Sequence, residues 1–418
     1  MRRVTTVFRS RRGRLAAALA VLGPGLIAAN AGNDAGGIAT YSSVGARYGY
    51  DLIWMMVVIT VSLVVVQEMA ARMGLVTGKG LADLVREEYG VRWALFATAS
   101  VLVANLGICI SEFVGIGAAL GLAHVPVLVS GPIGAVAVWL LLVRGTYKLA
   151  QRIFVAMTIP FFAYPVAAIL AHPRWGKVAH ATIAPHIQTS PGYVLLFVAT
   201  AGTTITPFMQ LYLQSAVVER GLGPEDLRKE RAEVISGSIF ANVVAVFIIV
   251  ATAATLYAHG HRSVNSAADA AKALAPFAGR FAEVLFAVGL LGASLLAAAV
   301  LPVTAAYVIS ETFGFERGIS RSPREAPVFV GVVTALVVIG AVVAMIPGIP
   351  VFRLLVGVQA VNGVLLPVTL FFVWRLSASK ELMGRYRNGR IFNVLAGATV
   401  VVTSALSLIL LAVTLTGG

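Results

Sequence analysis

A short polar stretch near the start of the chain interrupts an apolar run and contains one carboxylate. Residues 30–37 read Asn-Ala-Gly-Asn-Asp-Ala-Gly-Gly, so Asp34 lies among three glycines and two asparagines. These residue types disfavour a continuous helix. A carboxylate buried in hydrocarbon is costly unless a cation compensates it. The stretch therefore predicts a cation site at Asp34, which can also serve as the N-cap of the half-helix that follows.

A second interruption lies in a later apolar run. Residues 201–207 read Ala-Gly-Thr-Thr-Ile-Thr-Pro. Pro207 removes a backbone donor from the helix, and threonine hydroxyls can satisfy the carbonyls that this frees. Unwound backbone inside a membrane is tolerated only where protein buries it or where it lines a cavity. Two such breaks indicate a binding site between them, although a proline kink and a glycine-rich packing helix would read the same way.

Few other polar side chains lie inside the apolar runs. Glu112 is the second deep carboxylate, and it either tunes the field at the site or is protonated and bonded to a neighbouring helix. Amide side chains are more numerous: Gln210, Gln214 and Gln359. Oxygen donors of these kinds suit Mg²⁺, Ca²⁺ or Mn²⁺. The one sulfur near the second break, that of Met209, is expected to pack in the core.

The composition identifies the elements that must position these groups. Of the 418 residues, 59% are hydrophobic and only 12% are charged, against roughly 25% charged in soluble domains. Runs long enough to span ~30 Å of hydrocarbon recur along the chain. We predict an all-α polytopic membrane protein, one domain over residues 1–418, with eleven helices at 15–46, 50–71, 93–121, 125–143, 150–171, 191–218, 232–257, 281–311, 327–347, 351–374 and 391–415.

The distribution of basic residues predicts the orientation. The N-terminal segment and alternate loops after it hold most of the 32 lysines and arginines. Basic loops stay on the cytoplasmic side of a membrane, so we expect a cytoplasmic N-terminus, an extracytoplasmic C-terminus and a place in the plasma (inner) membrane. The net charge of +14 is then an effect of this bias. The expected environment is a lipid bilayer, with no nucleic-acid partner, and the oligomeric state stays open.

The two breaks fall in the first and sixth predicted helices. This spacing is typical of a five-plus-five inverted repeat with its binding site between two discontinuous helices. The first repeat would cover about residues 15–171 and the second about 191–374, and an extra helix would cover about 391–415.

The chain resembles the Nramp family of divalent-metal transporters over nearly its whole length. The resemblance lies in residues 23–27 (Gly-Pro-Gly-Leu-Ile), 34–37, 67–74 (Gln-Glu-Met-Ala-Ala-Arg-Met-Gly), 77–81 (Thr-Gly-Lys-Gly-Leu), 111–115 (Ser-Glu-Phe-Val-Gly) and 212–215 (Tyr-Leu-Gln-Ser). It implies the LeuT fold, with a metal ion held between the unwound regions of helices 1 and 6. It also implies a transporter and not an enzyme, with no cofactor beyond the metal that it carries.

The sequence departs from the family pattern at several site positions. Gly37 replaces the asparagine of Asp-Pro-Gly-Asn. Thr206 replaces the metal-binding methionine of helix 6 if the match is anchored on Pro207, and Pro207 itself replaces it if the match is anchored on residues 212–215. Gln214 replaces a helix 6 histidine, and Cys109 replaces the helix 3 aspartate that helps to carry protons. This pattern resembles the Nramp-related magnesium transporters, because losing a thioether and an amide favours a hard ion that retains water.

We therefore expect an alternating-access carrier of hard divalent cations, Mg²⁺ before Mn²⁺, without proton coupling. The candidate metal ligands are Asp34, Asn33, Ala31, Gly37, Thr203, Thr204, Thr206 and Gln359, and the candidates for gating or field tuning are Glu112, Gln210 and Gln214. Two alternatives stay open within transport: a proton-coupled carrier of Mn²⁺ or Fe²⁺, and an ion-coupled carrier of a small organic substrate on the same fold.

Overall fold

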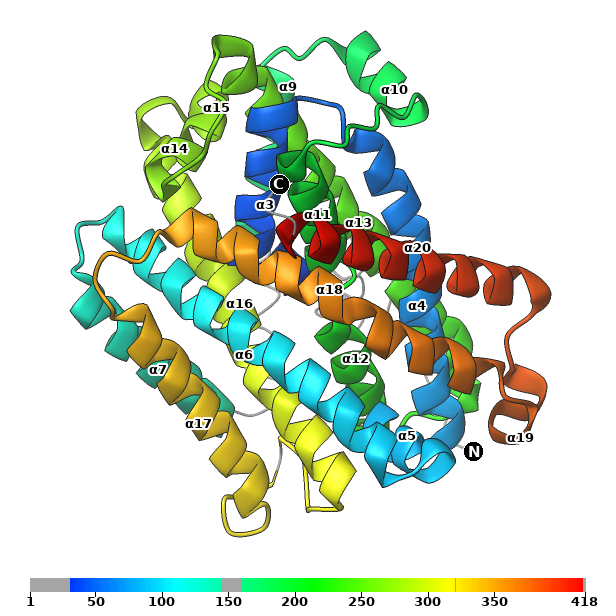
Figure 1. The fold of residues 1–418 in the computed structure, drawn as a ribbon. Coiled ribbons are helices and arrows are strands. Elements are labelled where there is room, and N and C mark those ends of the chain that lie inside the picture. The colour runs from blue at the N-terminus through cyan, green and yellow to red at the C-terminus, as the bar shows by residue number, and fades with distance from the viewer. Residues whose placement is uncertain (1–30, 144–158, 320, 416–418) are drawn as a thin grey trace, which may run out of the picture.

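The computed structural model describes residues 31–143, 159–319 and 321–415, and it contains helices and no strand within these ranges (Figure 1). A helix lies in each predicted span that these ranges cover. The first part of the first span, residues 15–30, and the first part of the fifth, 150–158, lie outside the described residues.

In the first half of the chain, the described residues begin within the predicted polar break. A single turn of 3-10 helix, η1 (Ala31–Asn33), precedes α3 (Ala35–Tyr48), with Asp34 between them. The following helices are α4 (Ile53–Thr77), α5 (Leu81–Tyr89), α6 (Val91–Gly121), α7 (Val127–Val143), η2 (Ile159–Phe162) and α9 (Ala163–Leu170).

The second half contains the other predicted break. Two residues, 205 and 206, separate the helix α11 (Pro191–Thr204) from α12 (Pro207–Glu219). Pro207 is the first residue of α12, where its missing N–H costs no helical hydrogen bond. The long helices that follow are α13 (Leu227–Thr255), α16 (Ala282–Phe313), α17 (Pro327–Ala344), α18 (Val351–Ala378) and α20 (Arg390–Leu415). The predicted discontinuity of helix 6 is confirmed.

Short helices fill the loops at the two ends of the bundle. At the end that is uppermost in Figure 1 lie α10 (Trp175–Ile183), α14 (Ala267–Ala271) and α15 (Ala275–Ala278). At the other end lie α5 and α19 (Lys380–Met383). The remaining short 3-10 turns are η3 (Pro224–Asp226), η4 (Tyr257–His259), η5 (Lys272–Leu274), η6 (Gly279–Phe281) and η7 (Gly384–Tyr386).

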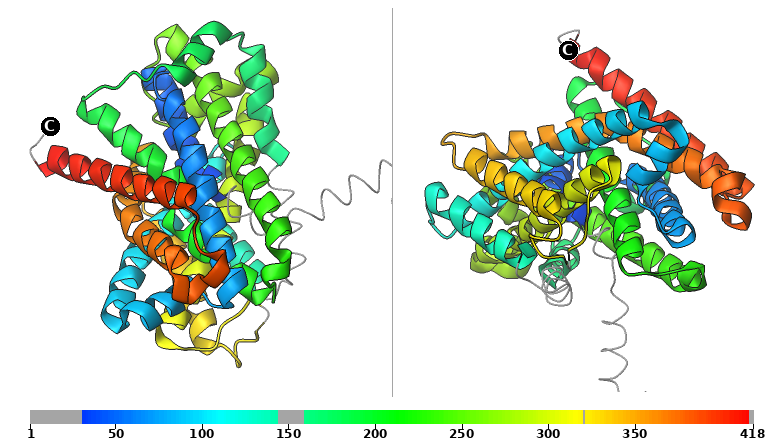
Figure 2. Two further views of the ribbon diagram at one scale, coloured as in Figure 1. Left: turned by 90° about the vertical axis from the view of Figure 1, so that its right-hand side faces the viewer. Right: turned by 90° about the horizontal axis from the view of Figure 1, so that it is seen from below.

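The long helices form a bundle of membrane dimensions. Within the described ranges, eight helical segments are long and apolar enough to cross a membrane, and α7 is a shorter apolar helix. The helix α20 lies at the periphery of the bundle, as both views of Figure 2 show. Because lipid chains are as apolar as leucine, membrane helices associate through close packing at small residues.

Glycines bring α11 and α18 into close contact. A Cβ built on Gly202 of α11 would overlap the carbonyl oxygen of Gln359 and would lie 2.7 Å from the Cα of Gly363, both in α18. The side chain of Asn362 spans the same interface, where its Nδ2 donates to the Gly202 carbonyl at 2.7 Å. This approach fixes where Gln359 lies relative to the second break.

The substitution Gly202→Ala tests this packing. The added methyl group meets backbone and not a flexible side chain, so α11 and α18 must separate, at a cost of about 1–3 kcal/mol. We expect a lower melting temperature for the purified protein, measured by scanning fluorimetry. Gly331→Ala is the matched control, because a Cβ on Gly331 of α17 meets nothing within 4 Å. Equal melting temperatures for the two variants would contradict the proposed role of Gly202.

Candidate metal site

Asp34 caps the half-helix that begins after the first break. Its Oδ1 accepts a hydrogen bond from the backbone N–H of Gly37 at 2.5 Å, and its backbone is extended, as an N-cap requires. The side chain of Gln359 donates from Nε2 to both carboxylate oxygens at 3.1 Å. Asp34 is only 1% exposed. The carboxylate is therefore buried, held in place, and bonded only by neutral donors in the described part of the chain.

The second deep carboxylate, Glu112, lies at the same end of α3. Its Oε2 accepts from the backbone N–H of Ala35 at 3.2 Å, and its Oε1 accepts from the Ser111 hydroxyl at 3.3 Å. The first N–H groups of a helix have no intrahelical partner, and the positive end of the helix dipole favours anions there. Asp34 and Glu112 thus share one helix N-terminus, which couples the charge of each to the other.

The two breaks face each other across a hydrogen bond. The Thr203 hydroxyl, at the end of α11, donates to the carbonyl oxygen of Gly32 at 3.2 Å. The Thr206 hydroxyl then donates to the Thr203 carbonyl at 3.3 Å. Thr204 turns toward α3, where its hydroxyl lies 2.9 Å from that of Tyr41. Backbone carbonyls from both breaks therefore meet beside Asp34.

Two glycines allow this approach. A Cβ on Gly36 would overlap the amide of Gln359, and a Cβ on Gly37 would overlap the carbonyl of Gly32 and lie 3.0 Å from the Thr203 hydroxyl. Gly37, expected as a ligand position, thus contributes its N–H to the cap and leaves room for the facing break.

The sulfur of Met209 lies beside the first break, whereas the sequence predicts only that Met209 packs in the core. A Cβ built on Gly32 would overlap the Met209 methyl group and lie 3.8 Å from its Sδ. The Nε2 of Gln67 lies 3.6 Å from the same sulfur. Side chains tilt toward the N-terminus of their helix, so a residue in the first turn of α12 points back to the break. The place of Met209 in the sequence, two residues after Pro207, is the signal that could have identified it as a site residue.

Several predicted residues lie apart from the Asp34 carboxylate. Asn33 donates from Nδ2 to the Ala241 carbonyl of α13 at 3.1 Å. The Gln210 amide nitrogen, in its better-bonded orientation, lies 3.0 Å from the Pro207 carbonyl. Gln214 donates to the Lys79 carbonyl at 2.9 Å. Ala31 contributes backbone to η1. The structure thus gathers Asp34, Gly37, Thr203, Thr206 and Gln359, and directs the amides of Asn33 and Gln214 elsewhere.

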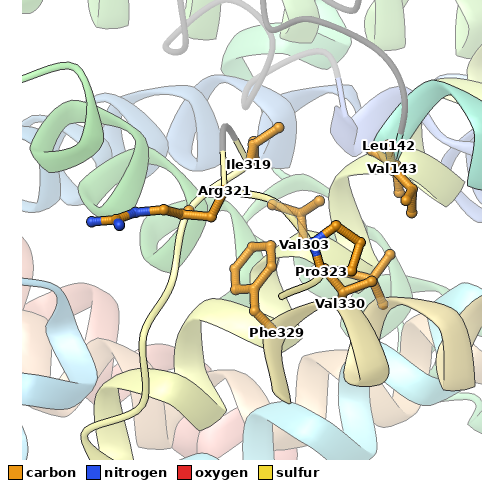
Figure 3. A pocket seen from close by; sticks show the side chains of 10 residues that line it. Leu142, Val143, Val303, Ile319, Arg321, Pro323, Phe329 and Val330 are labelled. Atoms are coloured by element: carbon orange, nitrogen blue, oxygen red, sulfur yellow. The ribbon is translucent and has the colours of Figure 1, made fainter. Parts of the chain in front are cut away.

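The donor set at the breaks has the Asp34 carboxylate in contact with neutral groups, and the Glu112 carboxylate lies at the same helix end. Within the described ranges, no three side chains of histidine, cysteine, aspartate or glutamate gather as a metal cluster. The pocket in Figure 3, near the loop between α16 and α17, has an apolar lining with Arg321 and no carboxylate. That pocket does not suit a cation, whereas the paired breaks bring the Asp34 carboxylate and backbone carbonyls together.

A comparison of two substitutions separates capping from charge at Asp34. The side chain in Asp34→Asn can still accept from Gly37, whereas Asp34→Ala removes both the cap and the charge. We expect Asp34→Ala to be less stable than Asp34→Asn by about 1 kcal/mol, measured by thermal unfolding in detergent. Equal stability of the two variants would show that the observed hydrogen bond contributes nothing to the start of α3.

Comparisons with known proteins cover nearly the whole chain. Residues 25–413 match the family model described as natural resistance-associated macrophage protein-like, Nramp. A divalent metal cation transporter MntH of Ralstonia nicotianae is 31% identical, over 92% of this chain and 89% of the relative. A transporter of the same name from Deinococcus radiodurans is 28% identical, over 93% of this chain and 88% of the relative.

Solved structures confirm the predicted LeuT fold. A manganese transporter of Eremococcus coleocola superposes with a TM-score of 0.75 at 21% identity, over 97% of this chain and 88% of that one. MhsT, solved with L-phenylalanine, superposes with a TM-score of 0.65 at 12% identity, over 93% of this chain and 97% of that one. With the match over residues 25–413, these findings show that the chain belongs to the Nramp family of multi-pass membrane transporters, which are not enzymes.

Proposed function

We propose that this protein is an alternating-access carrier of divalent metal cations in the plasma membrane, with Mn²⁺ preferred to Mg²⁺. The observation that carries the proposal is the buried Asp34 carboxylate, in a break that also contains the Gly32 carbonyl and that the Met209 side chain of α12 contacts at Gly32. Following the placement of basic residues, the N-terminus is cytoplasmic and the C-terminus extracytoplasmic.

A cation is the ligand that this charge favours. A buried carboxylate repels a carboxylate substrate, so the alternative of an organic anion at the half-helix ends is disfavoured. The Gln359 amide now directs its N–H group at both oxygens of Asp34. A cation would take that position, and rotation of the amide would offer the Oε1 of Gln359 as a further oxygen ligand.

The sulfur of Met209 supports a transition metal over magnesium. The magnesium expectation depended on the loss of a thioether from helix 6, yet the Met209 sulfur lies beside Gly32. Thioether ligands favour softer metals, and Mg²⁺ prefers oxygen and water. The relatives support the same choice, because one is named a manganese transporter and the others divalent metal cation transporters. The alternative of a Mn²⁺ or Fe²⁺ carrier is therefore the better-supported reading.

Proton coupling is part of this alternative, and Glu112 is the group we propose for it. Its carboxylate binds the N–H of Ala35, the residue next to Asp34. A divalent cation at Asp34 would favour the ionised form of Glu112 by direct attraction. Metal binding and proton release would then be linked, although Cys109 replaces the proton-carrying aspartate of helix 3.

Substitution of Met209 tests the proposed metal preference. We expect Met209→Ala to weaken Mn²⁺ binding roughly tenfold or more and to leave Mg²⁺ binding nearly unchanged, as measured by isothermal titration calorimetry. Met56→Ala is the matched control, because Met56 is also fully buried but lies in α4 outside the site. Asp34→Asn should abolish binding of both ions. Equal weakening of both ions in Met209→Ala would contradict a role for the sulfur.

Transport itself is measured in proteoliposomes. The rate of Mn²⁺ uptake by the wild-type protein should depend on a pH gradient across the membrane, and Glu112→Gln should lose that dependence while keeping Mn²⁺ binding. Uptake of Mg²⁺ that is faster than that of Mn²⁺ would instead support the magnesium reading. Uptake of an organic substrate with no metal flux would overturn the proposal.

A further inference from the structure

A recess lined by arginines lies where α4, α13 and the start of α20 meet. Four arginines line it, Arg72, Arg231, Arg385 and Arg387, with one carboxylate, that of Glu68. The lining therefore has a formal excess of three positive charges. Its space, open mouth included, is about 420 Å³. None of these residues takes part in the metal site.

Part of this charge is structural. Glu68 is 2% exposed and forms ion pairs with Arg72 at 3.1 Å and with Arg231 at 2.6 Å. Arg72 also donates to the Tyr386 carbonyl and, at 2.6 Å, to the Oδ1 of Asn388. The buried Arg72 thus ties the segment before α20 to α4, and the single negative charge of Glu68 is shared by two arginines.

The rest of the charge is free to bind a ligand. Arg385 and Arg387 are exposed, and in the described part of the chain no carboxylate pairs with either. Arg385 donates only to the neighbouring Tyr386 hydroxyl, at 2.8 Å. Arg231 is 46% exposed, and its bonds to Glu68 come from Nε and Nη2, which leaves Nη1 available.

Two acidic residues near the start of α13 have partners outside the recess. At the start of α13, Glu230 lies 3.8 Å from Arg220, and Asp226 accepts from the backbone N–H of Gly223. Neither lines the recess.

The recess opens beside a surface that faces lipid. Ile391 and Val394, in the first turns of α20, are 75% and 69% exposed. On a membrane-spanning helix, apolar side chains this exposed are available to contact acyl chains. The arginines therefore lie where an apolar helix surface meets a basic loop, which is the level of the lipid headgroups. By the distribution of basic residues, this is the cytoplasmic leaflet.

We propose that this recess binds the phosphate of an anionic phospholipid. Arginine guanidinium groups pair with phosphate through parallel N–H bonds, and basic pockets between membrane helices suit anionic headgroups. The acyl chains of such a lipid lie along Ile391 and Val394. The bound lipid joins the peripheral helix α20 to α4 and α13 through the segment that Arg72 already holds.

The test uses the full-length purified protein and native mass spectrometry. The probes are phosphatidylglycerol, phosphatidylcholine with the same acyl chains, and glycerol phosphate as a soluble phosphate. Wild-type protein should retain phosphatidylglycerol in preference to the other two. The double variant Arg385→Gln with Arg387→Gln should bind it about thirtyfold more weakly, because each basic residue near an anionic headgroup contributes a factor of about five.

A matched control removes the same charge elsewhere. Arg324 and Arg375 are exposed on the same predicted side of the membrane and lie outside the recess, so their double glutamine variant should bind phosphatidylglycerol as the wild type does. An equal loss in both double variants would show a diffuse charge effect and overturn the site. Equal retention of phosphatidylcholine, or equal binding of glycerol phosphate, would overturn the assignment to an anionic lipid.

Discussion

The buried carboxylate of Asp34 constrains the centre of this molecule. Asp34 is shielded from water, so the chain must supply donors to its carboxylate in a medium of low dielectric constant. It does so with the first N–H groups of α3 and with the amide of Gln359. Both are neutral, so the negative charge of an ionised Asp34 is left for a cation to neutralise. The broken helix is what makes the N–H groups available, since a continuous helix would have used them internally.

The second constraint is close approach of backbone segments. Gln359 reaches Asp34 because Gly202 lets α11 lie directly against α18, and because Gly36 leaves space for its amide. Gly37 in turn lets the first break lie against Thr203. A side chain at any of these glycines would separate elements that each carry part of the site. The polar chemistry of the site therefore depends on apolar packing one helix away.

Sequence reasoning recovers the elements better than the side-chain directions. Apolar length and the polar residues around Asp34 and Pro207 predict the helices and both breaks, because these are local properties. The direction of Asn33 toward α13 depends on a contact with Ala241, far away in the sequence. The position of the Met209 sulfur depends on where α12 starts, and a shift of one residue turns a helical side chain by about 100°. Such directions follow from tertiary packing, which composition and spacing do not encode.

The break in helix 6 also divides the elements that must move if a buried site is to open. Before the break, α11 packs against α18 and α20; after it, α12 packs against α4 and α16. The residues 205–206 between them have no helical backbone to transmit a rigid-body motion. The first break, at Asp34, separates η1 from α3 in the same way. Under the proposed function, an ion held between the two breaks would contact both sides of this division, because Asp34 starts α3 and Thr203 ends α11.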